Sequence, residues 1–158
     1  MRVVLDTNIF VSAMITSAGN PAAIVNAWLD GKFTLLTCAA HVGELRATLQ
    51  KPRVAELIKP YKAGRLVNQI RKLAEDVGAL PDVERSSYPT DDFLLAMSEA
   101  GQADYLVTGD KSGLLALDRH KATRIVSASD FATLFASSKK KTQMTDKRKA
   151  LVVLPDGW

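Results

Sequence analysis

Short apolar runs alternate with longer amphipathic patterns along most of the chain. Runs rich in valine, leucine and isoleucine are typical of buried strands, whereas apolar residues that recur every three or four positions indicate helices with one core-facing side. The sequence predicts strands at Arg2–Leu5, Phe33–Cys38, Ala79–Leu80, Tyr105–Thr108 and Arg124–Val126. It predicts helices at Ile9–Ile15, from Asn20 onwards, and at Val42–Gln50, Lys62–Val77, Phe93–Ala100 and Asp130–Ala136, with Asn8 and Thr90 as N-caps.

This alternation predicts an α/β fold class. Strands separated by helices are joined by right-handed crossovers, so we expect a three-layer α/β/α domain with a central parallel sheet over residues 1–137. Sites in such sheets form at the carboxyl ends of strands, beside a switch in strand order. The chemistry is therefore expected just after strands, which is where Asp6 and Asp110 stand.

The positive charge of the chain is unevenly distributed. The net charge is +4, but residues 1–138 hold 15 Lys and Arg against 15 Asp and Glu, so residues 139–158 supply the whole excess. We therefore treat residues 138–158 as a basic C-terminal tail. Such a tail is either a solvated, disordered end or a segment that attracts phosphate backbones, and charge alone leaves both readings open.

Cysteine content and hydropathy narrow the class of protein. The single cysteine, Cys38, excludes an internal disulfide and a cysteine zinc site, which favours a reducing cytoplasm. The apolar N-terminal run is interrupted by Asp6, so it predicts neither a signal peptide nor a membrane-spanning helix. We expect a cytoplasmic protein without a membrane partner.

Four acidic residues stand where such a sheet could bring them together. Asp6 and Asp110 follow predicted strands, Asp92 lies in the first turn of a predicted helix, and Glu44 lies on the helix after the second strand. Taken alone, each acidic residue could have an ordinary structural role as a turn residue, a helix cap or a solvated surface group. Together, neighbouring carboxylates raise one another's pKa, and a hard cation such as Mg²⁺ or Mn²⁺ removes that cost. Such a metal can orient a phosphate and activate water.

Other catalytic chemistries have less support. His41 precedes the helix that carries Glu44, and His120 lies in a polar loop, so the two histidines are isolated from each other in the sequence. The chain contains no Gly-x-Ser-x-Gly nucleophile motif. Metal chemistry is the remaining candidate.

Three segments resemble the PIN-domain ribonucleases, and most closely the VapC-like toxin components of bacterial toxin–antitoxin systems. They are Val3-Val4-Leu5-Asp6-Thr7-Asn8, Asp91-Asp92-Phe93-Leu94-Leu95-Ala96 and Ala103-Asp104-Tyr105-Leu106-Val107-Thr108-Gly109-Asp110-Lys111. The resemblance covers residues 1 to about 137, in matching order. It implies a PIN-like nuclease domain that cuts single-stranded RNA with a divalent metal, Mg²⁺ or Mn²⁺.

The resemblance also implies a role for each matched position. Asp6, Glu44, Asp92 and Asp110 correspond to the family's catalytic metal ligands, and the apolar register after Asp92 favours it over Asp91. Two small polar residues correspond to groups that hold the acids or a metal-bound water, namely Asn8 and Thr108. A small antitoxin protein and a homodimer are further expectations from the family.

One position departs from the family pattern. Many relatives carry another acid shortly after the residue matched by Asp110, whereas this chain has Ser112 and Gly113 there. The departure favours one firmly held metal over two.

Two alternatives remain open at this stage. A phosphatase of the haloacid-dehalogenase type also places an aspartate after its first strand, but it needs a second aspartate where this chain has Asn8. A non-catalytic RNA-binding PIN module would lack the acids, and the four are present here. Hydrolysis of a small phosphomonoester would favour the first alternative, and RNA binding without cleavage would favour the second.

Overall fold

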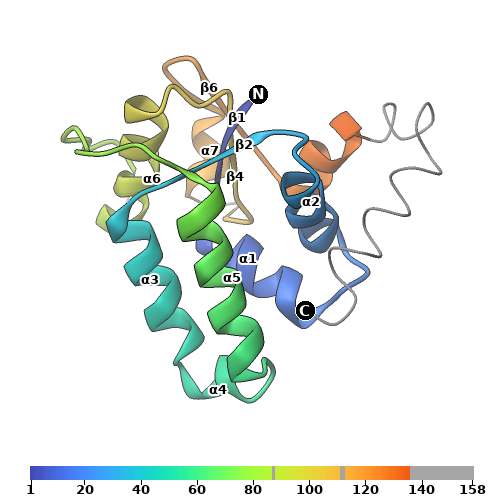
Figure 1. The fold of residues 1–158 in the computed structure, drawn as a ribbon. Coiled ribbons are helices and arrows are strands. Elements are labelled where there is room, and N and C mark those ends of the chain that lie inside the picture. Colours follow the sequence, from blue (N-terminus) through green and yellow to red (C-terminus); the bar gives the residue numbers. More distant parts are fainter. Residues whose placement is uncertain (87, 111–112, 136–158) are drawn as a thin grey trace.

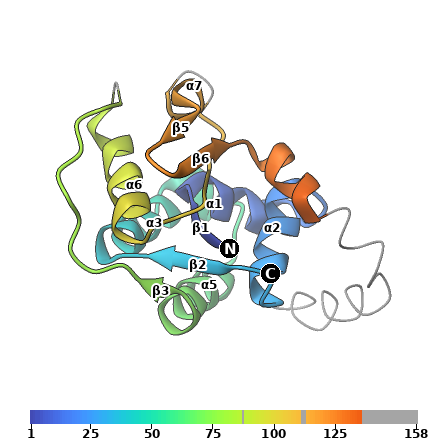
Figure 2. The same ribbon diagram turned by 90° about the horizontal axis from the view of Figure 1, so that it is seen from above.

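A six-stranded sheet forms the centre of the structure, a computed structural model that describes residues 1–86, 88–110 and 113–135. Its neighbouring strands follow the order β3-β2-β1-β4-β6-β5 (Figure 2). Every neighbouring pair is parallel except β5 and β6. The strands are β1 (Arg2–Leu5), β2 (Thr34–Thr37), β3 (Glu75–Asp76), β4 (Tyr105–Val107), β5 (Arg119–His120) and β6 (Thr123–Val126).

The direction of strand addition reverses at β1. The chain first adds β2 and β3 on one side of β1, and then places β4 and β6 on its other side. The switch in strand order therefore lies between β1 and β4, which pair in parallel from Val3↔Tyr105 to Leu5↔Val107. Their carboxyl ends meet at the position where α/β sheets form their sites.

Helices connect the strands and cover both faces of the sheet. They are α1 (Thr7–Ile15), α2 (Asn20–Leu29), α3 (Ala39–Leu49), α4 (Pro52–Ala55), α5 (Pro60–Leu73), α6 (Pro89–Ala100) and α7 (Leu114–Leu117), and residues 128–135 are also helical. Proline stands in the first turn of α2, α4, α5 and α6, where its missing N–H would have no helical partner.

Two separate hydrophobic cores lie on the two faces of the sheet. Val3 and Leu5 pack with α1, α2, α3 and α5, whereas Val4 packs with α6 and α7. Successive residues of a strand point to opposite faces, so a strand covered on both sides is apolar at every position. This arrangement confirms the predicted three-layer α/β/α fold.

Helices α3 and α5 form an antiparallel hairpin that extends beyond the sheet. Figure 1 shows the two helices side by side, with α4 at the far end of the hairpin. Helix α3 leaves the carboxyl end of β2, so the hairpin begins at the same edge of the sheet as the switch between β1 and β4.

Several predicted boundaries were wrong for local reasons. Helix α1 begins at Thr7, so its N-cap is Asp6 and not Asn8, and α6 begins at Pro89, which puts Thr90 inside the helix. The third strand is Glu75–Asp76 and not Ala79–Leu80, because α5 ends at Leu73 and the next residues pair with β2. Its exposed polar residues carry no apolar signal.

Two elements of the structure were not predicted, and parts of the prediction lie outside the described residues. Helix α7 and the antiparallel strand β5 were not predicted, so the sheet is parallel in all but its last strand. The predicted tail, residues 138–158, and the last predicted helical residue, Ala136, lie outside the described residues.

No single helix in the described ranges is long and apolar enough to cross a membrane. By length and composition alone, α1 and α2 would pass this test only as a pair, and they are bent by 102° relative to each other. Both helices contribute buried side chains to the core on their face of the sheet.

Candidate active site

Two of the predicted acids stand at the switch in strand order. Asp6 directly follows β1, and Asp110 comes three residues after β4, its parallel neighbour. The backbone N–H of Asp6 donates to the carbonyl of Val107 over 2.9 Å, which extends the pairing of β1 and β4 up to the first acid. The expectation that Asp6 and Asp110 lie at the same strand ends is therefore met by the geometry.

A single buried hydroxyl connects these two acids. Thr108, which is fully buried, donates from Oγ1 to Oδ2 of Asp6 over 2.8 Å. The same oxygen accepts the backbone N–H of Asp110 over 3.1 Å. Thr108 was predicted to hold the acids, and its two hydrogen bonds fix Asp6 relative to the turn that carries Asp110.

The carboxylate of Asp110 is enclosed by the backbone of Gly113. The N–H of Gly113 donates to Oδ1 of Asp110 over 3.0 Å. A Cβ at position 113 would lie 2.1 Å from Oδ2 of the same carboxylate, which is far inside van der Waals contact. Only glycine therefore fits at position 113 while Asp110 keeps this orientation.

Glu44 reaches the site from α3. Its carboxylate accepts a hydrogen bond from the hydroxyl of Thr7, a buried residue at the start of α1. Thr7 directly follows Asp6, so the contact of Thr7 with Glu44 brings the carboxylates of Asp6 and Glu44 to the same place. The charge of Glu44 also contributes to raising the pKa of Asp6, which places the two acids within electrostatic range.

Burial is the main reason that the pKa of Asp6 lies above its usual value. The hydroxyl of Thr108 and the backbone N–H groups of Thr7 and Asn8 lower this pKa, but they do not cancel the effect of burial. The negative charge of Glu44 raises it further. A buried carboxylate with a carboxylate neighbour is an environment that a cation would stabilise.

The fourth acid at this place is Asp91. Burial, a hydrogen bond with Asp110 and the charges of Asp110, Asp6 and Glu44 raise the pKa of Asp91 to about 6. A hydrogen bond between two carboxyl groups requires a proton on one of them, which agrees with the raised pKa of Asp91. Asp91 is therefore electrostatically coupled to the other three acids.

Asp92 faces in another direction, which corrects the expectation that it would converge with the other three acids. Its Oδ1 accepts the backbone N–H groups of Arg85 and Ser86 over 3.1 and 2.8 Å. Burial alone would raise the pKa of Asp92, but these N–H groups, the Ser86 hydroxyl and His120 lower it. Each helical residue turns the side chain by about 100°, so adjacent acids of α6 cannot face the same crevice.

The side chains of two other polar residues lie apart from the acids. The side chain of Asn8 is exposed, and Asn8 contacts Asp6 through its backbone N–H. Nδ1 of His120 lies 2.9 Å from the guanidinium of Arg85, and its Nε2 lies 3.5 Å from the carboxylate of Glu99. Neither residue is in the group formed by Asp6, Glu44, Asp91 and Asp110, which we call the acidic crevice.

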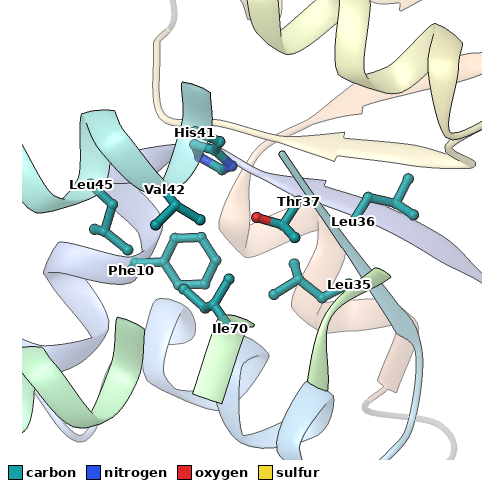
Figure 3. Close-up of a pocket in the computed structure, with 8 residues that line it drawn as sticks. All are labelled: Phe10, Leu35, Leu36, Thr37, His41, Val42, Leu45 and Ile70. Carbon is teal, nitrogen blue, oxygen red and sulfur yellow. The ribbon is translucent and has the colours of Figure 1, made fainter. Parts of the chain in front are cut away.

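His41 lies in an apolar cavity and not in the acidic crevice. Figure 3 shows its ring above Phe10, in a cavity of about 10 Å³ that Thr37 and several aliphatic side chains also line. Complete burial lowers the pKa of His41 to about 4. Its ring also contacts Phe93, with the ring centroids 5.8 Å apart. His41 is therefore a neutral core residue between α3 and its neighbours.

The oxygen donors of the acidic crevice fit a hard divalent cation. Four carboxylates from four separate parts of the fold approach one another, and burial together with the neighbouring acids raises the pKa of Asp6 and Asp91. Among the residues that the structure describes, no three acidic, histidine or cysteine side chains are arranged to hold one metal ion as they stand. Magnesium is commonly bound through one or two carboxylates with several waters, so the Asp91–Asp110 pair satisfies its chemistry.

Sequence reasoning missed three contributors to the crevice. Asp91 was passed over because the apolar register after Asp92 looked better, yet residues 94–98 are all buried and do not distinguish the two acids. The contact of Thr7 with Glu44 spans 37 positions and has no local signal. Gly113 did have a signal, since a glycine three residues after a candidate ligand often allows close backbone approach.

Comparisons with known proteins returned one match. A family model described as PIN domain matches residues 2–112, which include Asp6, Glu44, Asp91 and Asp110. No curated protein and no solved structure matched the chain.

Proposed function

Because the chain belongs to the PIN domain family, whose members are generally nucleases, we propose that it is a divalent-metal-dependent endoribonuclease that hydrolyses phosphodiester bonds of single-stranded RNA. The observation that carries this proposal is the approach of Asp91, Asp110, Asp6 and Glu44 to one another at the switch in strand order, where burial and the neighbouring acids raise the pKa of Asp91. Four neighbouring carboxylates make a poor surface for a polyanion. With a divalent cation they become a site that attracts and orients a phosphate.

Asp91 and Asp110 are the pair that would hold Mg²⁺ or Mn²⁺, with Asp6 beside them and Glu44 completing the shell or positioning the attacking water. When bound, such an ion neutralises charge on the scissile phosphate and lowers the pKa of a water molecule. Since the pKa of Asp91 is raised to about 6, a cation held there would compete with a proton on Asp91. The site would thus work best where Asp91 is ionised.

The neighbouring residues of the chain orient these carboxylates. Thr108 donates to Oδ2 of Asp6, which leaves Oδ1 of Asp6 free of this bond. Thr7 donates to one oxygen of Glu44 in the same way. Gly113 donates to Oδ1 of Asp110 and keeps side-chain atoms away from Oδ2. Three of the four carboxylates, those of Asp6, Glu44 and Asp110, are thus held by hydrogen bonds from neighbouring groups of the chain.

The test is RNA cleavage by purified protein with Mg²⁺, with Mn²⁺ and with a chelator, for wild type and for Asp6→Asn. We expect cleavage with either metal, no cleavage with chelator, and a loss of about 100-fold or more in Asp6→Asn. Cleavage that survives both the chelator and the substitution would contradict the proposal. RNA binding without cleavage would point to a non-catalytic module, and hydrolysis of a phosphomonoester lost in Asp6→Asn would point to a phosphatase.

A more specific part of the proposal is a role as the toxin of a toxin–antitoxin pair, with a small antitoxin as partner and a homodimer as the active form. It is supported by the resemblance of the motifs around Asp6 and Asp110 to VapC-like proteins. Expression of wild type and of Asp6→Asn in a bacterial host tests it, with growth and RNA integrity followed together. Growth arrest with RNA cleavage by wild type alone is expected, and arrest by both variants would count against the toxin role.

A further inference from the structure

The hairpin next to the acidic crevice carries a concentration of positive charge. We define the basic hairpin as residues 46–72, which comprise the end of α3, all of α4, α5 up to Lys72, and the connections between them. It holds eight of the 15 Lys and Arg of residues 1–138 but only one of their 15 acids, Glu56. The eight are Arg46, Lys51, Arg53, Lys59, Lys62, Arg65, Arg71 and Lys72. The rest of residues 1–138 is correspondingly acidic.

We propose that the basic hairpin binds the phosphodiester backbone of single-stranded RNA and guides it to the acidic crevice, an inference that rests on the proposed ribonuclease function. Positive charge of this density in a domain is the electrostatic footprint of a polyanion partner. The net charge of residues 1–138 is zero because acidic residues outside the hairpin balance its positive charge. The total charge therefore does not reveal the basic hairpin.

Among the described residues, the cations of the hairpin have no hydrogen-bonding or ion-pair partners. None of the eight side chains forms an ion pair or a hydrogen bond in the described ranges, whereas Arg2 and Lys121, outside the hairpin, pair with Glu75 and Glu99. All eight are exposed except Lys62, which is half-buried. Eight like charges on one hairpin repel one another unless an anion lies among them, and a phosphate backbone supplies anions at a regular spacing.

The hairpin also contains a cleft with the chemistry of a nucleobase site. A cavity of about 650 Å³ lies between α3, α4 and α5. Its buried members are the apolar residues Leu49, Ile58 and Val67, which form the floor. The exposed polar residues that line it are Arg46, Gln50 and Asn68. An apolar floor accepts the face of a base, and amide and guanidinium groups at the rim match the donors and acceptors along its edges.

An exposed aromatic residue of the hairpin is a second feature that suits nucleobases. Tyr61 stands in the first turn of α5 with 58% of its surface exposed. An exposed tyrosine among unpaired cations offers a surface on which a base can stack, and such stacking tolerates any sequence. Tyr61 and Arg65 lie four residues apart on the helix and so occupy the same side of it.

The hairpin is continuous with the crevice. Helix α3 carries Glu44, and Arg46 follows two residues later, about 3 Å further along the helix axis but about 200° around it. Gln50, at the rim of the cleft, lies about 9 Å along the axis from Glu44. The cleft is therefore within two helical turns of Glu44 but on another side of α3, and a strand bound in it crosses this one helix to reach the acids.

An acidic protein is the competing occupant, since it would also be attracted to these cations. The cleft favours RNA, because its exposed amides and the neighbouring tyrosine suit flat heterocyclic bases better than carboxylate side chains. The test below separates the two occupants.

The experiment measures binding of a fluorescein-labelled single-stranded RNA by anisotropy, in chelator and over a range of salt concentrations, so that no cleavage occurs. Two double variants of the full chain are compared, Arg53→Gln/Arg65→Gln in the hairpin and Arg119→Gln/Arg124→Gln as the matched control. Arg119 and Arg124 are exposed and face each other across β5 and β6, and Arg124 lies at the amino end of its strand, away from the acids. Thermal unfolding confirms that both variants are folded.

We expect the hairpin variant to bind RNA about tenfold more weakly or worse, and to lower the salt slope by about 1.4, since each phosphate contact with a single strand contributes about 0.7. The control variant should bind as wild type does. Tyr61→Leu should weaken binding without changing the salt slope, because stacking releases no counterions. Equal effects in the two double variants, or no effect in either, would overturn the inference and leave an acidic protein as the occupant.

These outcomes are independent of the proposed catalysis. If the hairpin variant loses RNA binding but wild type never cleaves with Mg²⁺ or Mn²⁺, the hairpin inference stands and the ribonuclease proposal fails. If wild type cleaves and the hairpin variant binds RNA as wild type does, the ribonuclease proposal stands and the hairpin inference fails.

Discussion

The acidic crevice and the basic hairpin share α3, but the protein holds their side chains in opposite ways. In the crevice, hydrogen bonds from Thr7, Thr108 and Gly113 fix individual carboxylate oxygens. In the hairpin, the described structure gives none of the eight cations a hydrogen bond or an ion pair. The first region is built for defined geometry, and the second acts by the number and density of its charges.

This difference determines how each region responds to change. A small displacement of a ligand in the crevice should cost much activity at any salt concentration, because catalysis depends on the position of atoms. Removal of one hairpin cation should cost little, and salt should weaken the whole hairpin, because charges at an exposed surface are screened. The following predictions test this contrast, from the largest expected effect to the smallest.

The largest effect is expected for Gly113→Ala. The new Cβ would lie 2.1 Å from Oδ2 of Asp110, so the carboxylate must move. We expect RNA cleavage to fall by about 100-fold, with RNA binding to the hairpin unchanged. The matched control is Gly109→Ala, since a Cβ at position 109 would meet no atom within 4 Å. Comparable rates for Gly113→Ala and wild type would show that the position of Asp110 is not critical.

A second effect concerns the pH dependence of stability caused by His41, which lies near the start of α3. Its pKa is about 4 in the folded protein, against an ordinary value near 6.5, so the unfolded chain binds more protons between these two pH values. Stability contributed by neutral His41 is present above pH ~6.5 and falls by roughly 2 to 3 kcal/mol as pH decreases to ~4. Urea unfolding of wild type and His41→Phe at several pH values measures this, and His41→Phe should lose less stability on acidification.

Asp91 has the opposite effect on stability over the same pH range. The pKa of Asp91 is raised to about 6, so the folded state binds its proton more tightly than the unfolded chain does. The stability gained from this is present below pH ~3.8 and is lost as pH rises through ~6. Asp91→Asn should therefore steepen the loss of stability on acidification. An identical pH dependence in His41→Phe, Asp91→Asn and wild type would contradict both assignments.

A smaller effect is expected for Thr108→Val, which removes the hydroxyl that joins Asp6 to Asp110. We expect cleavage to fall about tenfold, since the acids remain but one of their constraints is lost. The hydroxyl lowers the pKa of Asp6, so its removal should shift the acidic limb of the pH–rate profile to higher pH. Thr108→Ser keeps the hydroxyl and should behave nearly as wild type. If Val and Ser variants are equally impaired, the methyl group and not the hydroxyl is important.

The smallest effect is the stabilisation by metal alone. A cation that binds the crevice relieves the repulsion among Asp6, Asp91 and Asp110 and stabilises the folded state. At ten times its Kd, Mg²⁺ should contribute about 1.4 kcal/mol and raise Tm by about 3 to 5 °C. The shift should disappear in Asp91→Asn and persist in Arg53→Gln/Arg65→Gln. A shift of equal size in all three proteins would place the cation elsewhere.

The sequence predicted the layers of the fold well because each buried strand has a local apolar signature. The run Arg2–Leu5 matched β1 residue for residue. The edge strands were not predicted because they lack such a signature. Glu75–Asp76 and Arg119–His120 are short and polar, and their pairing depends on neighbouring strands.

The candidate site was predicted less completely. Strand ends and the order of motifs identified Asp6 and Asp110, because the switch in a parallel sheet brings such positions together. The choice between Asp91 and Asp92 depends on the rotation of α6 about its axis, and its residues 94–98, which are all buried, do not reveal that rotation. In the structure, Asp92 accepts the N–H groups of the preceding loop, a role that leaves Asp91 for the crevice.

The most direct test of the account is therefore to compare Asp91→Asn with Asp92→Asn in Mg²⁺-dependent RNA cleavage. The substitutions are identical and one residue apart, but only Asp91 is coupled to Asp110, Asp6 and Glu44. We predict that Asp91→Asn lowers the cleavage rate by about 100-fold or more, whereas Asp92→Asn keeps most of the activity and loses about 1 kcal/mol of stability with its two hydrogen bonds. Loss of activity in Asp92→Asn with full activity in Asp91→Asn would contradict the site described here.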